Sequence, residues 1–191
     1  MKFKFLFIIL LIMNSGYSQR FKILEGKLEN LKNISSFRTE FNYENIQVHG
    51  FISEEEFLKE KMEKRKDNPD KAAEFKTSWY SNREQYYNPA FIEYFNSYFK
   101  NQECKIDSGS AYLMKVNLTW IYNGYAVEPA KLSAVIDFYE ANNPSKKLLS
   151  IEFDKVIGYE KKMVMVHDHE RIAGAFEKLA RNLAIQLKRF H

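Results

Sequence analysis

The chain has 191 residues, of which 45% are hydrophobic and 16% aromatic, with 29 basic and 25 acidic side chains and a net charge of +4. This aromatic content predicts a packed globular domain rather than a disordered chain, because aromatic rings gain much free energy on burial. The near balance of charges argues against a nucleic-acid partner, which would require a track of basic side chains.

The first eighteen residues have the three parts of a secretory signal peptide. Lys2 and Lys4 form a positive start, and residues 5–13 are an uninterrupted apolar run (FLFIILLIM). The small residues Gly16 and Ser18 then precede a predicted cleavage site. Because the apolar run is too short to span a bilayer, we expect export to the periplasm or the cell exterior.

The remainder of the chain, residues 19–191, is predicted to form a single domain. It contains no linker, no internal repeat and no second apolar run that would cross a membrane. Its one cysteine, Cys104, cannot form an intramolecular disulfide, and we expect it to be a buried small apolar side chain. No cysteine stands at the predicted cleavage site, so we expect no lipid anchor.

The amino-terminal half begins with strand patterns. Residues 21–31 fit either a short strand or an arm. Over residues 37–48 the aromatic side chains Phe37, Phe41 and Tyr43 alternate with polar ones, which predicts a strand with one aromatic face.

Helix signals follow. Ser53 and Glu56 form a capping box that predicts a charged, solvated helix through Lys66. The pairs Asn68-Pro69 and Asn88-Pro89 predict two further helix starts, each with an asparagine N-cap. Aromatic residues then recur at helical spacing, which predicts a core face lying on a sheet, with peptide or glycan binding as the alternative; they are Phe91, Tyr94, Phe95, Tyr98 and Phe99.

The carboxy-terminal half predicts an antiparallel meander and a long helix. Alternating apolar residues mark strands over 112–122, 132–138 and 149–153, joined by short connections. Apolar residues at helical spacing from Ile172 to Leu187 then predict a helix that covers the sheet. The predicted fold is α/β (α+β), with a mixed or antiparallel sheet of about four strands and the other helices packed on one face.

This order of elements, with the ending ERIAGAFEKLARNLAIQLKR, resembles a group of exported bacterial envelope domains. The group includes the amino-terminal domain of TolB and the outer-membrane lipoprotein activators of peptidoglycan synthases. The nearest resemblance is to uncharacterised secreted proteins of Gram-negative bacteria, in which a strand like SSFRTEFNYENIQVHG precedes a helix like SEEEFLKEK. The resemblance implies an exported envelope module and assigns no functional residue.

Two side-chain clusters are candidates for chemistry. His167 and His169 could hold a metal together with one more ligand. The alternative, which we favour, is that Asp168 caps the final helix and no cofactor is bound. Three carboxylates on predicted neighbouring strands could serve acid–base catalysis or simply face solvent, and we favour solvent; they are Asp137, Glu152 and Asp154.

No sequence motif of a known catalytic class is present, so the leading hypothesis is a non-enzymatic envelope protein that binds another protein or a cell-wall component. The predicted binding surface is the aromatic-rich middle of the chain, formed by Trp79, Tyr80, Tyr86 and Tyr87. Two alternatives stay open. One is a secreted metal-dependent hydrolase that uses His167 and His169, and the other is a small apolar-ligand-binding protein.

Overall fold

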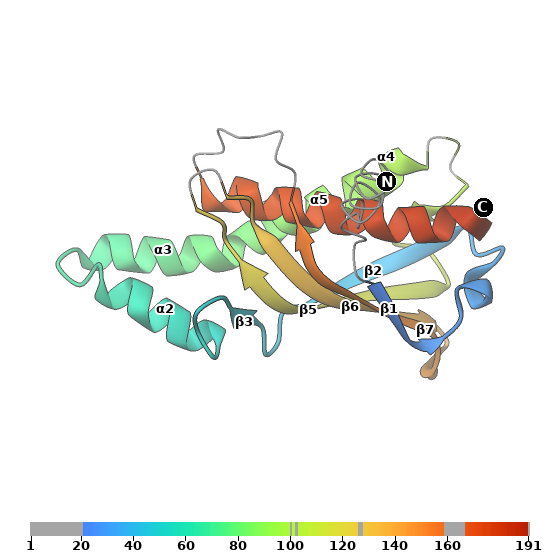
Figure 1. Ribbon diagram of the computed structural model, residues 1–191, viewed down its shortest axis with the longest axis horizontal. Helices are drawn as coiled ribbons and strands as arrows, with labels where there is room; N and C mark the ends of the chain where they lie inside the picture. Colours follow the sequence, from blue (N-terminus) through green and yellow to red (C-terminus); the bar gives the residue numbers. More distant parts are fainter. Residues whose placement is uncertain (1–20, 100, 102, 126–127, 159–166, 191) are drawn as a thin grey trace, which may run out of the picture.

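The computed structural model describes residues 21–99, 101, 103–125, 128–158 and 167–190. The predicted signal peptide, residues 1–18, lies outside these described residues. Within them the chain folds as a mixed α/β structure in which helices, including a long carboxy-terminal one, pack on a sheet (Figure 1). The predicted fold class is confirmed, but the sheet has seven strands rather than about four.

The sheet combines an antiparallel meander with parallel strands. Its order is β1-β7-β6-β5-β2-β4, and the short β3 also pairs with β5. Antiparallel pairing joins β5 to β6, β6 to β7 and β7 to β1. In contrast, β2 and β3 each pair in parallel with β5, and β4 pairs in parallel with β2. The strand bounds are β1 Phe21–Gly26, β2 Ser36–Asn42, β3 Gln47–Val48, β4 Lys105–Ile106, β5 Tyr112–Tyr122, β6 Lys131–Glu140 and β7 Asn143–Ile157.

The core lies between the sheet and two helices, α4 (Asn88–Tyr98) and α5 (Asp168–Leu187). The rings of Phe91 and Phe176, one from each helix, lie 5.5 Å and 6.5 Å from the Phe41 ring on β2. The predicted core face of α5 is confirmed, because Ile172, Phe176, Leu179, Leu183 and Leu187 are all fully buried. None of the described helices is both long and apolar enough to cross a bilayer.

A β-bulge in β5 changes the predicted face of this strand. The pairing of β5 with β6 shifts between Leu118 and Trp120, so the alternation of side chains restarts there. Ile121 is buried as a result, while Trp120 and Tyr122 pack with the His49 ring at 5.7 Å and 4.9 Å. The alternation over residues 112–122, taken as an unbroken period of two, predicts that Trp120 and Tyr122 continue the apolar face of Met114; the bulge shows that this prediction is wrong.

The connection between the parallel strands β3 and β5 contains a projecting arm. A parallel pair needs a long crossover, and here it includes the helices α2 (Glu54–Glu63) and α3 (Pro69–Asn82), which extend past the end of the sheet (Figure 1). The predicted caps are confirmed at both starts: the Ser53 hydroxyl accepts from the Glu56 amide at 3.2 Å, and the Asn68 side chain accepts from the Lys71 amide at 3.0 Å.

A π-helical turn, η2 (Arg83–Tyr87), joins α3 to α4 without a break. The amide of Asn88 donates to the carbonyl of Arg83, five residues earlier. Pro89 cannot donate to the residue four earlier, and the wider turn before it lets the helix continue. The prediction that the Asn88 side chain caps a new helix is therefore wrong.

Candidate binding site on the two-helix arm

The arm has a small aromatic core of its own. The Phe57 ring on α2 lies 4.7 Å from Trp79 and 6.1 Å from Phe75 on α3, and 5.3 Å from Phe51 in the preceding loop. The guanidinium of Arg65 lies 4.4 Å above the Phe75 ring. These contacts hold the two helices together on one side and leave their other side open.

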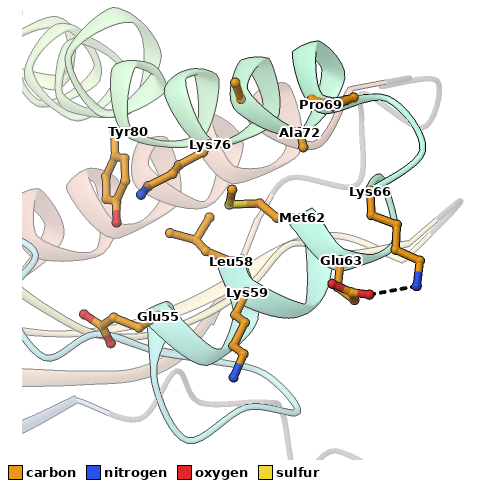
Figure 2. A pocket seen from close by; sticks show the side chains of 11 residues that line it. Glu55, Leu58, Lys59, Met62, Glu63, Lys66, Pro69, Ala72, Lys76 and Tyr80 are labelled. Atoms are coloured by element: carbon orange, nitrogen blue, oxygen red, sulfur yellow. Dashed lines mark hydrogen bonds and ion pairs between the residues drawn. The ribbon is translucent and has the colours of Figure 1, made fainter.

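That open side is a groove of about 600 Å³ between α2 and α3 (Figure 2). Each helix contributes one face at helical spacing: Glu55, Leu58, Lys59, Met62, Glu63 and Lys66 from α2 and the following turn, and Pro69, Ala72, Ala73, Lys76 and Tyr80 from α3. Leu58 and Met62 point from α2 toward α3, while Lys76 and Tyr80 point back toward α2. The floor is therefore apolar; Leu58 and Ala72 are buried in it, whereas Met62 is half-buried and reachable from solvent.

Lysines stand at the rim of this groove. Lys66 pairs with Glu63 at 2.9 Å, whereas Lys59 and Lys76 make no ion pair with any residue the structure describes. Both of these side chains are exposed. Lys76 points toward α2, whereas Lys59 points away from α3, and the carboxylates of Glu55 and Glu63 also line the groove. A ligand carboxylate at the rim would therefore meet the ammonium group of Lys76 beside an apolar floor.

A buried ion pair anchors the base of the arm. Glu54, the first residue of α2, is buried, and its Oε1 accepts from the indole Nε1 of Trp79 at 2.6 Å and pairs with the guanidinium of Arg83. A buried carboxylate needs such partners because its desolvation is costly. The three side chains therefore tie α2 to the end of α3 and to the π-helical turn.

The Arg83 guanidinium also packs between two tyrosine rings, at 4.4 Å from Tyr43 and 4.8 Å from Tyr80. The Tyr43 hydroxyl donates to Asn88 Oδ1 at 2.7 Å, and the Asn88 amide donates to Glu84 at 3.0 Å. Burial raises the pKa of Tyr43 far above its ordinary value, so its hydroxyl remains a donor at any physiological pH. This network links the arm to Tyr43, the residue that follows β2.

The structure divides the four residues predicted as a binding surface. Trp79 and Tyr87 are buried, Trp79 in the arm and Tyr87 stacked 5.4 Å from Phe176. Tyr80 and Tyr86 are 38% and 42% exposed and so can reach a partner. Of the four, only Tyr80 lines the groove.

The two histidines predicted as metal ligands lie at the start of α5. Their rings stack at 5.4 Å, and the His169 ring lies 4.4 Å from Tyr86, so the structure brings two separately predicted sites together. Among the described residues no group of three or more histidine, cysteine or acidic side chains is placed to hold a metal ion. Asp168 is in the first turn, paired with Arg171, and His167 occupies the N-cap position, so the prediction of Asp168 as the cap is wrong by one residue.

The three strand carboxylates have separate partners. Asp137 pairs with Lys147 at 3.1 Å and accepts from Asn117 at 3.0 Å, and Asp154 accepts from Ser133 at 2.9 Å. Glu152 lies opposite Lys22 of β1. These contacts lie on the polar face of the sheet. None of the partners named is shared by two of the three carboxylates.

Cys104 is fully buried, as the sequence predicts. Burial raises the pKa of its thiol to about 12, so the thiol is protonated at neutral pH. A protonated, buried thiol is a poor nucleophile.

Sequence reasoning missed the groove. Leu58 and Met62, four residues apart in a strongly charged helix, were the available signal, since such spacing places two apolar side chains on one helix face. Glu54 and Arg83 carried no signal, because nothing in the sequence distinguishes Glu54 from the next two glutamates.

No family model matches the chain, and neither a curated protein nor a solved structure matches it.

Proposed function

We propose that this chain is a non-enzymatic binding module, exported to a bacterial envelope, that recognises a segment of a partner protein in the groove between α2 and α3. The observation that carries the proposal is the apolar floor of the groove, where Met62 is half-buried, beside the ammonium group of Lys76. Export rests on the signal-peptide pattern, and the envelope setting on the resemblance described above.

The lining favours a protein segment over a cell-wall glycan. Glycans are polar ligands that need many hydrogen-bonding partners, whereas this floor is formed by leucine, methionine, alanine and proline side chains. A groove between two helices suits a peptide that inserts apolar anchors. Methionine adds adaptability, because its unbranched side chain can repack around different anchors.

The rim specifies the charge of the partner. Lys76 would attract an acidic side chain next to the apolar anchor, which raises the association rate and orients the segment. The expected ligand is therefore a short amphipathic segment with one or two large apolar residues flanked by aspartate or glutamate.

Selection from a displayed random peptide library tests this function directly. We expect enriched peptides to combine a large apolar residue with acidic neighbours and to lose binding to a Met62→Glu variant, which places a carboxylate on the groove floor. Soluble peptidoglycan fragments are titrated in parallel. Absence of enrichment, equal binding of the peptides to the variant, or saturable binding of the glycan alone would contradict the proposal.

A further inference from the structure

The strand β1 is an apolar edge of the sheet. It pairs with β7 on one side, and no described strand pairs with its other side. All six of its residues are exposed, and Leu24 is 47% exposed. Proteins usually protect such edges with charges, proline or short length, because unpaired backbone groups beside apolar side chains invite another strand. This edge keeps three large apolar side chains exposed: Phe21, Ile23 and Leu24.

A β-bulge sets which side chains share a face of this strand. Lys22 lies opposite Glu152 and Glu25 opposite Ser150, with the register shift at Leu24 between them. Because Glu152 and Ser150 are two residues apart on β7, Lys22 and Glu25 lie on the same face of the sheet. An unbulged strand would place them on opposite faces. Phe21 and Ile23, opposite Phe153 and Ile151, lie on the face that carries the core.

We propose that β1 binds β1 of a second copy of this chain in antiparallel pairing, so that the two sheets join across a two-fold axis. The register that we infer keeps Leu24 as the bulged, unpaired residue in both strands and places Ile23 opposite the partner's Ile23, on the axis. Lys22 then lies opposite the partner's Glu25, and the symmetry repeats this pair. Phe21 lies opposite the partner's Gly26.

Charge and shape both favour a second copy over an unrelated strand. The edge carries one basic and one acidic residue at positions that are exchanged by a two-fold axis, so it is complementary to itself. Gly26 has a φ of +75°, and a Cβ there would lie 2.1 Å from the Leu148 carbonyl oxygen, so the position requires glycine. Its bare backbone leaves room for the partner's Phe21 ring, an arrangement known to stabilise glycine in sheets.

Charge reversal tests the pairing and its register. Sedimentation equilibrium is measured on the protein in the form in which the cell accumulates it, for wild type and for Lys22→Glu and Glu25→Lys. We expect wild type to dimerise weakly with increasing concentration, since the interface is one short strand. Each single reversal places like charges opposite each other twice and should weaken the dimer roughly tenfold or more.

An equimolar mixture of the two variants supplies the decisive result. The Lys22→Glu chain offers two acidic side chains and the Glu25→Lys chain two basic ones, so the mixture should form a heterodimer that neither variant forms alone. Melting temperatures of both variants show whether each is folded, because Glu25 also lies 3.6 Å from Lys147. A monomeric wild type, unchanged dimerisation of the single variants, or no association in the mixture of folded variants would overturn the proposal. This inference is independent of the function proposed for the groove.

Discussion

The body and the arm of this molecule are stabilised in different ways. The body packs apolar side chains of α4 and α5 on a seven-stranded sheet, and its central residues are fully buried. The arm has four aromatic rings as its core and is anchored by the buried Glu54–Arg83 pair. The hydrophobic effect that stabilises the body is non-directional, whereas an ion pair requires a defined geometry. The difference indicates a scaffold that supplies stability and an arm that is held in a fixed orientation relative to it.

Substitutions of phenylalanine in the two regions should give the largest contrast. Phe176→Ala removes a fully buried ring that contacts Phe41 and Tyr87, and we expect it to lower the free energy of unfolding by about 4 kcal/mol. Phe75→Ala in the arm removes a half-buried ring and should cost about 1 to 2 kcal/mol. Urea unfolding followed by circular dichroism measures both. Equal costs would contradict the distinction between scaffold and arm.

Removing one partner of the anchor should be the next largest effect. Arg83→Met leaves the buried Glu54 carboxylate without its cation, and we expect a loss of about 3 kcal/mol in the stability of the arm. Fluorescence of Trp79, isolated by a Trp120→Phe substitution, reports this unfolding because the indole donates to Glu54. The matched control is the double variant Glu54→Gln/Arg83→Met, which removes both charges and should recover much of the loss. If the double variant is no more stable than the single one, the pair is not the anchor.

Alkaline pH should weaken the body through Cys104. The pKa of this thiol is about 12 in the folded protein and about 8.5 in an unfolded chain, so above pH 8.5 the unfolded state loses its proton first. This contribution is fully present below pH 8.5 and is lost as pH rises toward 12, at about 1.4 kcal/mol per pH unit. Stability measured against pH should therefore fall less steeply in Cys104→Ala. Identical slopes for the two proteins would show that the thiol is not protonated in the folded state at these pH values.

The smallest change in stability is expected in the groove. Met62 is half-buried at an open surface, so Met62→Glu should alter the free energy of unfolding by less than about 1 kcal/mol. Thermal unfolding measures this shift. A loss as large as that of Phe176→Ala would show that Met62 is part of a closed core rather than the floor of a binding site.

The parts of the fold that could be predicted are those determined by local spacing. The meander and α5 follow from apolar periods, and the Ser53 cap follows from a four-residue motif, so all were recognisable. The bulge near Thr119 and the π-helical turn before Pro89 were not, because each is an exception to a regular period that is selected by tertiary packing.

The candidate site likewise depends on tertiary contacts. Aromatic composition indicated the region from Trp79 to Tyr87, but burial depends on which helix face meets which neighbour, and Trp79 and Tyr87 face inward. Glu54 and Arg83 are separated by 29 residues and meet only because α2 and α3 fold back on each other. Contacts of this kind have no signature in a single sequence.

The affinity of one selected peptide for two lysine variants shows whether the peptide binds in the groove. Lys76 lines the groove, whereas Lys71 lies on the same helix outside it and is also exposed. Lys76→Glu and Lys71→Glu make the same change in net charge. Isothermal titration at low ionic strength should show that Lys76→Glu weakens binding by about fivefold and that Lys71→Glu leaves it nearly unchanged. Equal losses in the two variants would show that the peptide responds to overall charge, and the groove would not be its binding site.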